Sequence, residues 1–310
     1  MKWKKLGLVF RPENNYEWMT SHASLPLPDK ISEDVLRIYF ATRTREMNSV
    51  TTFIEVEAEN PSKILYRHDR PVLSLGKLGA FDDGGAAPYS LVTQGRKKYL
   101  YYGGFNASVT VSYRNAIGLA VSEDNGLTFQ RVCEGPVVDR NQQEPYFTAA
   151  ADVMRSDDKW RMWYGSATGW LVFAGKTEPR YQIKYGYSAD GVNWTRNNVT
   201  CIEYRFDGEA NVRPCVIRED GLYRMWYCYR GSVNYRTDKE QSYRLGYAES
   251  VDGEKWTRKD DDVGIERSEQ GWHSQMMCYP YIYEHKGRKY LLYNGNGFGE
   301  SGFGCAVLED

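Results

Sequence analysis

The chain has 310 residues, a length that suits one large all-β domain or two smaller domains. Aromatic residues make up 15% of it, which favours half-buried β-strands over helices. The formal net charge is −1, from 40 basic and 41 acidic side chains, so no overall field attracts nucleic acid or an anionic membrane surface. We therefore expect neither nucleic acid nor a membrane as a partner.

Two further features predict a cytoplasmic protein. The N-terminal sequence MKWKKLGLVFRPEN has an apolar run shorter than a signal-peptide core, and no later stretch approaches 18 apolar residues. The cysteines form no C-x-x-C pair, and several lie inside apolar strand patterns, which indicates reduced thiols without a chemical role. They are Cys133, Cys201, Cys215, Cys228, Cys278 and Cys305.

An aromatic strand recurs five times along the chain, as RIYFAT, YLYYGG, RMWYGS, RMWYCY and YLLYNG. Its last aromatic residue falls at Phe40, Tyr102, Tyr164, Tyr227 and Tyr293, at intervals of 62, 62, 63 and 66 residues. In the three middle units a second alternating strand leads into a glycine turn, as in IGLAVSEDNGLTF, IKYGYSADGVNW and LGYAESVDGEKW, which is a hairpin signal. Each unit thus supplies about four strands, the number in a propeller blade.

The last unit is one strand short. After Tyr293 only FGCAVLED remains, and the N-terminal segment WKKLGLVF resembles the missing outer strand. Joining the two ends in one blade removes exposed sheet edges. We therefore predict an all-β fold, a single five-bladed β-propeller with four-stranded blades. The expected blades are 13–75, 76–140, 141–203, 204–265 and 266–310 completed by 2–12.

The turn SEDNGLTF matches the Asp-box pattern S-x-D-x-G-x-T-W/F of sialidases and related propellers. Its Asp124, and the equivalent Asp190 and Asp252, fall between the third and fourth strands, at the blade periphery. There an aspartate caps the turn through nearby backbone amides. We expect these three residues to be structural.

The innermost strands, which should line the central channel, align as SHASLP, DDGGAAP, FTAAADV, GEANVRP and SQMMCYP. Ionisable residues stand at or near the strand starts and should converge on the axis. They are His22 in the first unit, Asp82 and Asp83 in the second, Glu144 and Asp152 in the third, Glu209 and Arg213 in the fourth, and His273 in the fifth.

The loops between second and third strands should open on the same face, and they are long and polar. Arginine and asparagine side chains fix hydroxyl or carboxylate groups, and a tryptophan stacks on sugar rings, so these loops predict a carbohydrate pocket. They carry Arg43, Asn106, Arg114, Trp170, Arg180, Arg230, Arg236, Arg244, Asn294 and Asn296.

The repeat, the glycine turns and the acidic strand starts resemble the five-bladed glycoside hydrolase superfamily of arabinanases, β-xylosidases, invertases, levansucrases and mannoside phosphorylases. The resemblance covers almost the whole chain and implies activity on a glycoside. In that superfamily the strand starts of the first three blades commonly provide Asp, Asp and Glu. Here His22 stands at the first position, and the third strand, FTAAAD, has no Glu, so the chain departs from the catalytic pattern.

Glycoside cleavage needs one carboxylic acid to protonate the leaving oxygen and one carboxylate as base or nucleophile. We predict Asp83 and Glu209 for these roles, with Asp82 as a further candidate. Turn capping or hydrogen bonding between blades is the alternative for all three. The two histidines are expected to bind substrate, cap a loop or transfer a proton. The predicted substrate-binding residues are His22, Arg43, Asn106, Glu144, Asp152, Trp170, Arg213, Arg230, His273, Asn294 and Asn296. No metal-ligand spacing is present, and no cofactor is expected.

The main functional hypothesis is a glycoside hydrolase or transglycosidase acting on a small glycoside, and the arginine-rich loops favour an anionic one. A glycoside phosphorylase is the nearest alternative, because inorganic phosphate needs such arginines. An alternative of another class is a non-catalytic sugar-binding or scaffold propeller, since a fold does not determine a function. The sugar, the linkage, the stereochemical outcome and the oligomeric state stay open.

Overall fold

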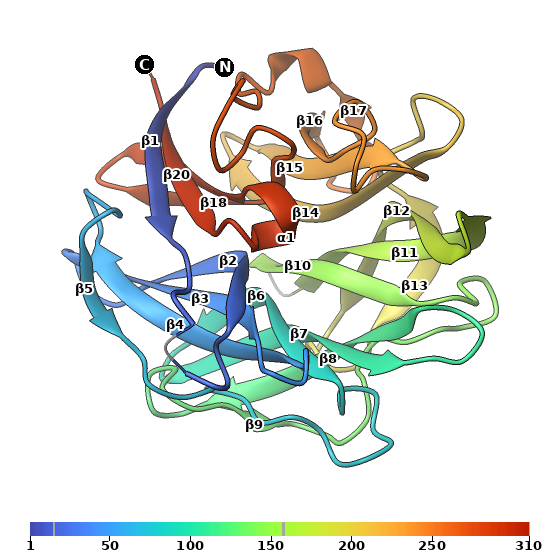
Figure 1. Cartoon of the computed structure of the whole chain (residues 1–310), viewed down its shortest axis with the longest axis horizontal. Coiled ribbons are helices and arrows are strands. Elements are labelled where there is room, and N and C mark those ends of the chain that lie inside the picture. The colour runs from blue at the N-terminus through green and yellow to red at the C-terminus, as the bar shows by residue number, and fades with distance from the viewer. Residues whose placement is uncertain (15, 157–158, 310) are drawn as a thin grey trace.

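The computed structural model describes residues 1–14, 16–156 and 159–309, and these are built almost entirely of β-strands arranged as a β-propeller (Figure 1). The strands run in chain order as follows. The first group is β2 (Ser21–Lys30), β3 (Val35–Arg43), β4 (Ser49–Glu57) and β5 (Ile64–Arg67), and the second is β6 (Gly85–Gln94), β7 (Lys97–Ala107), β8 (Tyr113–Ser122) and β9 (Gln130–Arg131). The third is β10 (Thr148–Ser156), β11 (Lys159–Phe173), β12 (Lys176–Ser188) and β13 (Thr195–Thr200), and the fourth is β14 (Glu209–Glu219), β15 (Leu222–Gly231), β16 (Arg244–Ser250) and β17 (Thr257–Arg258). The last group is β18 (Cys278–His285), β19 (Arg288–Asn294), β20 (Phe303–Leu308) and the N-terminal β1 (Trp3–Phe10).

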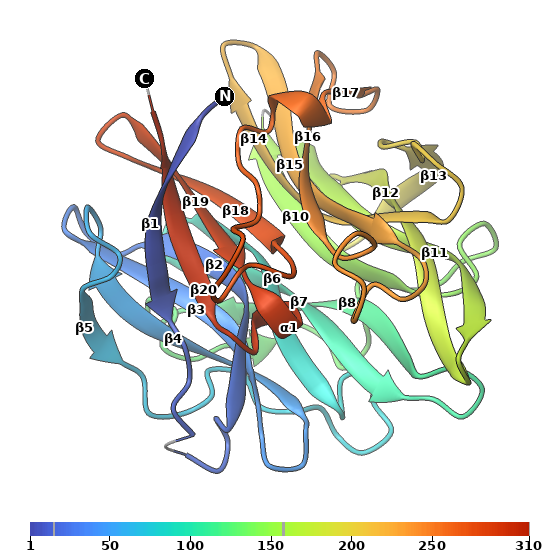
Figure 2. The same ribbon diagram turned by 45° about the horizontal axis from the view of Figure 1, so that its top comes forward.

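The first strands of these groups surround a common axis. Each of β2, β6, β10, β14 and β18 contacts the next, and β18 returns to β2, which closes the ring. Three groups are separate four-stranded sheets, while the first two are joined into an eight-stranded sheet by the parallel pairing of Ser49 with Gly85. Two short helical segments, η1 (Asp260–Asp262) and α1 (Asn296–Gly299), complete the described elements. α1 lies near the centre of the ring in Figures 1 and 2.

The N-terminal strand completes the last sheet, as the sequence predicts. β1 pairs antiparallel with β20, from Trp3 opposite Leu308 to Phe10 opposite Phe303 (Figure 1). The indole nitrogen of Trp3 also donates a hydrogen bond of 3.0 Å to the Val263 carbonyl of the preceding group. The two ends of the described chain are therefore held in one sheet, and the ring has no open edge at this point.

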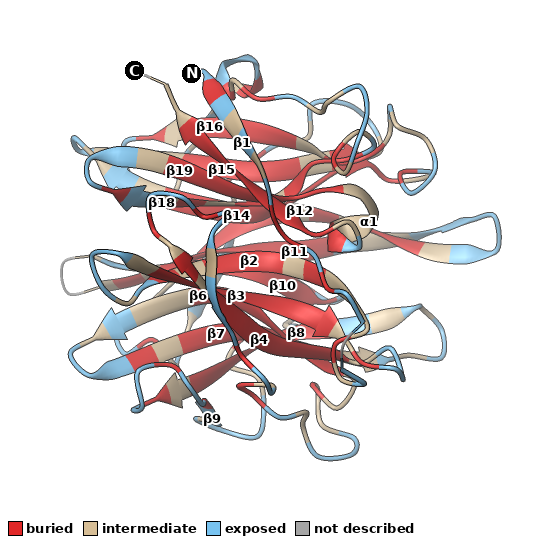
Figure 3. Ribbon diagram, turned by 60° about the vertical axis from the view of Figure 1, so that its left-hand side comes forward, coloured by how far each residue is buried: buried red, intermediate tan, exposed pale blue. Residues whose placement is uncertain are grey.

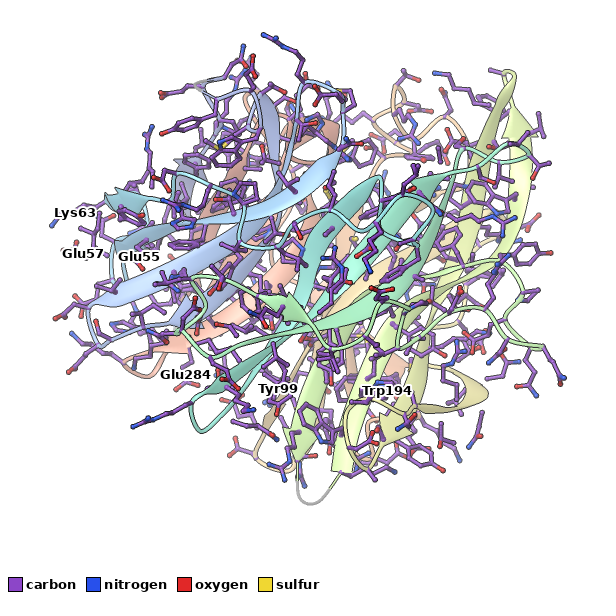
Figure 4. The ribbon with its side chains drawn as sticks, turned by 90° about the horizontal axis from the view of Figure 1, so that it is seen from below. Glu55, Glu57, Lys63, Tyr99, Trp194 and Glu284 are labelled. Atoms are coloured by element: carbon purple, nitrogen blue, oxygen red, sulfur yellow. The ribbon has the colours of Figure 1, made fainter. Side chains whose placement is uncertain are left out.

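The predicted structural role of the aspartate turns is confirmed by their hydrogen bonds. Asp190 accepts bonds from the backbone amides of Val192 and Asn193, both at 2.8 Å, and Asp124 and Asp252 accept equivalent bonds. These bonds, with the Asn193 amide foremost, hold the pKa of Asp190 below its ordinary value. Trp194 follows this turn and lies toward the lower edge of Figure 4, whereas the yellow-green β11–β12 hairpin reaches the upper right. The turn is therefore remote from the loops of the opposite face.

Each aspartate turn also ties its sheet to the preceding group. The carbonyl of the turn glycine accepts a hydrogen bond from an aromatic side chain on the second strand of that group. The pairs are Tyr39 with Gly126 at 2.8 Å, Tyr101 with Gly191 at 2.7 Å and Trp163 with Gly253 at 2.7 Å. The residue directly before the last aromatic residue of the repeated strand therefore joins neighbouring strand groups.

The buried core is formed mainly by residues of the strands. Figure 3 shows most strand residues buried and the connecting loops exposed. All six cysteines are free thiols; Cys133 is exposed and the other five are buried. Burial raises the pKa of the Cys215 thiol, which suits a small core residue. Among the described residues no helix is both long and apolar enough to span a bilayer.

Candidate functional site

A register break near the start of each first strand shapes the centre of the ring. Such a bulge bends the strand and turns side chains toward a new direction. In four of these strands the break holds a residue with positive φ: Leu25 (59°), Ala150 (51°), Arg213 (59°) and Tyr279 (55°). Three of the four are followed directly by proline, which donates no ladder hydrogen bond and is tolerated at a bulge. Leu25, Ala150 and Tyr279 line the space at the axis.

This space is a pocket of about 480 Å³ that continues into a chamber of about 110 Å³. Six residues are common to both parts: Leu25, Phe105, Tyr113, Tyr181, Tyr243 and Tyr279. The pocket is further lined by His22, Ser24, Ala41, Arg43, Met47, Asn48, Ser49, Gly84, Ala87, Asn106, Ala107, Tyr235, Arg236 and Phe298. We call it the central pocket. Aromatic walls with a few polar groups are typical of a small-molecule site.

Arg43 is the basic group of the central pocket without a carboxylate partner in the described part of the chain. It ends β3 and is half-buried, and burial lowers the pKa of its guanidinium group. His22 lies beside it, and its Nδ1 atom is 2.9 Å from the Ser21 hydroxyl. Burial first, and then the charge of Arg43, lower the pKa of His22, so the imidazole is neutral at pH 7. The pocket therefore presents a guanidinium group that forms no ion pair with another described residue, while the Glu300 carboxylate acts on the pKa of His22 in the direction opposite to Arg43.

Tyrosines form the opposite wall. The hydroxyl groups of Tyr181 and Tyr243 are hydrogen-bonded to each other, and the Nε atom of buried Arg230 donates to both, at 3.0 and 3.2 Å. Tyr243 also meets Phe298 edge to face, with 6.0 Å between ring centroids. Arg230 is fixed further by the carbonyls of Gly231 and Pro179. It therefore supports the pocket wall from behind.

Glu178 is the carboxylate joined most directly to this wall. It is buried on β12 and accepts a hydrogen bond from the Tyr235 hydroxyl, while the Nη2 atom of Arg236 lies 3.1 Å from its Oε2 atom. The guanidinium carbon of Arg230 stands 3.6 Å from the Tyr235 ring centroid. Burial raises the pKa of the Tyr235 hydroxyl, and Arg230 and Arg236 act in the opposite direction. A phenol, a carboxylate and two cations thus meet at the pocket.

Three of the predicted site residues line the central pocket, namely His22, Arg43 and Asn106. Asp83 precedes the lining residue Gly84, and its Oδ2 atom accepts a hydrogen bond of 2.8 Å from the Gly79 amide. No aspartate or glutamate of the described chain is among the residues that line the pocket or its chamber. The acid–base roles of Asp83 and Glu209 stay predictions.

Asp82, Glu144 and Glu209 lie elsewhere, in a repeated arrangement with an arginine of the fourth strand of their group. Arg131 of β9 is 2.7 Å from Asp82, Arg196 of β13 is 3.5 Å from Glu144, and Arg258 of β17 is 2.7 Å from Glu209. The second-strand tyrosines Tyr102 and Tyr164 donate to Asp82 and Glu144, and Tyr227 donates to Asp260, which also binds Arg258. All these carboxylates are buried. Their pairing favours a structural role.

Two predicted residues lie among the first strands without lining the pocket. Asp152 accepts hydrogen bonds from Ser90 at 3.0 Å and from the Val216 amide at 2.6 Å, so it links three neighbouring strands. Burial raises the pKa of Asp152 to about 6. Arg213 is buried and donates to the Tyr89 carbonyl at 2.8 Å. Asp152 and Arg213 therefore connect neighbouring inner strands of the ring.

The remaining predicted residues serve local packing. Trp170 contacts Tyr113 and Phe147, at 5.5 and 5.6 Å between centroids. His273 is buried against Trp272 and Tyr293, with its Nε2 atom 2.7 Å from the Ser268 hydroxyl. Asn294 joins the last sheet to the Ala23 carbonyl and the Leu25 amide. Asn296 accepts from the backbone amides of Gln275 and Met276.

The pocket residues that sequence reasoning missed include seven aromatic residues: Phe105, Tyr113, Tyr181, Tyr235, Tyr243, Tyr279 and Phe298. A signal is present for two of them, because Tyr113 begins the third strand of its group and Tyr243 directly precedes the third strand of another. Tyr235 and Arg236 lie in a loop that the sequence marks as part of the carbohydrate face. Tyr279 lies at the bulge of β18, and this bulge turns it toward the pocket.

Sequence comparison finds two relatives in Mycobacterium tuberculosis, MT1551 of strain CDC 1551 and Rv1502 of strain H37Rv. Each is 39% identical to this chain over 311 residues, and the match covers the full length of both chains. The chain belongs to the same family as these mycobacterial proteins. No protein-family model matches the sequence.

Solved structures share the fold of the family. One titled "Glycoside hydrolase" is similar with a TM-score of 0.75 and 18% identity, covering 99% of this chain and 92% of that one. A glycosyl hydrolase from Bacteroides ovatus has a TM-score of 0.71 at 13% identity, covering 99% and 93%. A thermostable family-43 glycoside hydrolase has a TM-score of 0.66 at 16% identity, covering 94% and 90%. The family therefore has the fold of propeller glycoside hydrolases.

Proposed function

We infer that this protein is a carbohydrate-processing enzyme of the glycoside hydrolase type, and that its central pocket takes a small glycoside carrying an anionic group. The observation that carries this proposal is Arg43, a half-buried guanidinium group without a carboxylate partner among the described residues, in a pocket walled by tyrosines. A buried charge is costly unless it is paired, so a ligand carboxylate or phosphate is its natural partner. The aromatic wall suits the apolar faces of a sugar ring.

The chemistry that the pocket supports best uses Tyr235 and Glu178. Glycosidases generally employ two carboxylates, but a tyrosine nucleophile is a known exception. Glu178 accepts the Tyr235 hydrogen bond and can take the phenolic proton as the Tyr235 oxygen bonds to the anomeric carbon. The glycosidic bond then breaks, and the protonated Glu178 can return this proton to the departing oxygen. Arg230 and Arg236, at 3.6 and 4.6 Å from the Tyr235 ring centroid, stabilise the negative charge that develops on the Tyr235 oxygen. Arg230 lies near the end of β15, and Arg236 lies in the loop that follows this strand.

A kinetic comparison tests whether Tyr235 and Glu178, or the pair Asp83 and Glu209 predicted from sequence, carry out the reaction. Purified protein is incubated with acidic and neutral nitrophenyl glycosides, with and without inorganic phosphate. Loss of turnover in Tyr235→Phe and Glu178→Gln, with retention in Glu209→Gln, supports the proposal. Loss in Asp83→Asn and Glu209→Gln alone returns the chemistry to the two carboxylates predicted from sequence. Turnover that requires phosphate identifies a phosphorylase.

A sugar-binding propeller without catalysis is the second candidate. It is favoured by the absence of aspartate and glutamate from the described residues that line the pocket. In that case acidic glycans bind, Arg43→Gln weakens the binding, and the bound glycans are unchanged after long incubation. Mass spectrometry of the recovered glycans separates the two functions.

A further inference from the structure

The β11–β12 hairpin continues beyond the sheet to which it belongs. β10 pairs with β11 only as far as Ser166, whereas β11 and β12 pair with each other to Phe173 and Lys176. Ala174 and Gly175 close the hairpin with positive φ angles of 49° and 75°, a tight two-residue turn. Among the described residues no third strand pairs with either edge of this end, and the consecutive apolar side chains of Leu171, Val172 and Phe173 are all exposed.

A neighbouring loop adds to this surface. The Ser112 amide donates a hydrogen bond of 2.8 Å to the Thr177 hydroxyl, and the Ser112 hydroxyl donates to the Thr177 carbonyl at 3.1 Å. Three residues before Ser112 lies Val109, which is fully exposed. We call Val109, Leu171, Val172 and Phe173 the apolar tip. Packing within the protein does not account for three consecutive exposed apolar side chains at the end of a projecting hairpin, with a fourth on the neighbouring loop.

Basic side chains lie in the segments that carry the apolar tip, although the whole chain carries −1. Residues 105–116 and 166–182 contain Arg114, Lys176 and Arg180, and a single carboxylate, Glu178. Glu178 is buried in its pairs with Tyr235 and Arg236, and Arg180 is paired with exposed Asp207 at 3.5 Å, so Arg114 and Lys176 are the exposed basic groups that can meet a partner. The expectation that the chain has no membrane partner rests on net charge, which does not describe this local field.

The hairpin is joined to the central pocket at its base. Trp170 packs on Tyr113 of the pocket wall, and Leu171 stands opposite Glu178, which binds Tyr235 of that wall. α1, whose Phe298 lines the pocket, and the end of the hairpin lie on the same face when Figures 1 and 2 are compared. A surface that held the apolar tip would therefore face the pocket.

We propose that the apolar tip inserts into the interface of an anionic lipid bilayer, with Lys176 and Arg114 at the headgroups. The composition of this end favours this occupant, because exposed apolar side chains can be buried at a bilayer interface while neighbouring basic side chains are attracted to anionic headgroups. Resting on the proposed function, this arrangement makes the substrate a glycan attached to a lipid. Binding to the bilayer itself needs no sugar.

Vesicle sedimentation tests the proposal. The full chain is mixed with vesicles of phosphatidylcholine and phosphatidylglycerol, or of phosphatidylcholine alone, in the absence of any sugar. Val172→Asp and Phe173→Asp together should lower the bound fraction at the anionic vesicles more than about tenfold, and Lys176→Glu should lower it less. Val251→Asp is the matched control, because Val251 is 81% exposed and Val172 is 79% exposed, and Val251 lies in the remote Asp252 turn.

Each outcome is decisive. Binding to anionic vesicles that the tip variant loses and the control keeps supports the proposal. No binding by the unmodified chain, or equal binding by the tip variant, overturns it. Self-association in analytical ultracentrifugation that only the tip variant abolishes, without vesicle binding, assigns the tip to a second copy instead. Circular dichroism checks folding of all variants. Since sugar binding by Arg43 is measured without vesicles, failure of either proposal leaves the other testable.

Discussion

The hydroxyl group of Tyr235 donates a hydrogen bond to the buried carboxylate of Glu178, and this contact connects the central pocket to an acidic group. Removing either partner should abolish proton transfer while the pocket keeps its shape. We expect Tyr235→Phe and Glu178→Gln each to lower kcat by about 100-fold or more with a small effect on KM. Steady-state kinetics on a glycoside that the protein turns over provide the measurement. Equal kcat values for variant and unmodified protein would contradict this assignment.

The carboxylate of Asp82 lies between the Tyr102 hydroxyl, at 2.8 Å, and the guanidinium group of Arg131, at 2.7 Å. Asp82→Ala leaves the partly buried Arg131 without its counter-charge and the Tyr102 hydroxyl without its acceptor, so we expect a loss of stability of about 2–3 kcal/mol. Arg131→Met together with Asp82→Leu removes both charges and should restore part of the lost stability. Denaturant unfolding measures the change. If Asp82→Ala lowered kcat and left the unfolding free energy unchanged, Asp82 would be catalytic as the sequence suggested.

The hydroxyl of Tyr101 ties the second strand group to the turn carbonyl of Gly191 at 2.7 Å. Tyr101→Phe should destabilise the protein by about 1 kcal/mol, because the buried Gly191 carbonyl loses one of its two donors and keeps the Trp194 indole nitrogen at 3.2 Å. Sugar binding should stay as it is, since neither residue reaches the pocket. Thermal unfolding and binding assays on the same preparation test both halves of this prediction. Tyr99→Phe is a matched control on the same strand.

Protonation of His273 should make the free energy of unfolding depend on pH. Burial, and then the charge of Lys5, lower the pKa of His273 to about 4 from 6.5. Because the unfolded chain binds the proton more readily, the stabilising contribution is complete above pH 6.5 and falls as the pH drops toward 4. The difference amounts to about 1–3 kcal/mol. We expect His273→Gln to be less sensitive to this change in pH than the unmodified protein, as measured by urea unfolding at several pH values. Parallel curves for the two proteins would refute it.

Repetition in the sequence made much of the fold predictable. The five aromatic strands and the glycine turns give the strand groups, and the similarity of WKKLGLVF to an outer strand gives the pairing of β1 with β20. These features follow from local turn chemistry and alternation, which a single sequence displays.

The site was harder to predict because burial and pairing are not local. Asp82, Glu144 and Glu209 start inner strands in sequence, but arginines about fifty residues later neutralise them in space. The sequences TFQR, NWTR and KWTR, which end in Arg131, Arg196 and Arg258, repeat with the blades and indicate structural partners. The bulges that direct Leu25 and Tyr279 into the pocket depend on the curvature of the whole ring.

The most direct test of the central claim is a binding measurement on Arg43. An array pairs each glycan bearing a uronic acid or a phosphate with its neutral counterpart, and Arg96→Gln, at an exposed turn remote from the pocket, is the control. We expect the unmodified protein and Arg96→Gln to prefer an acidic glycan, and Arg43→Gln to lose that preference through binding at least about tenfold weaker. Equal binding of acidic and neutral glycans, or an unchanged preference in Arg43→Gln, would contradict an anionic ligand in the central pocket.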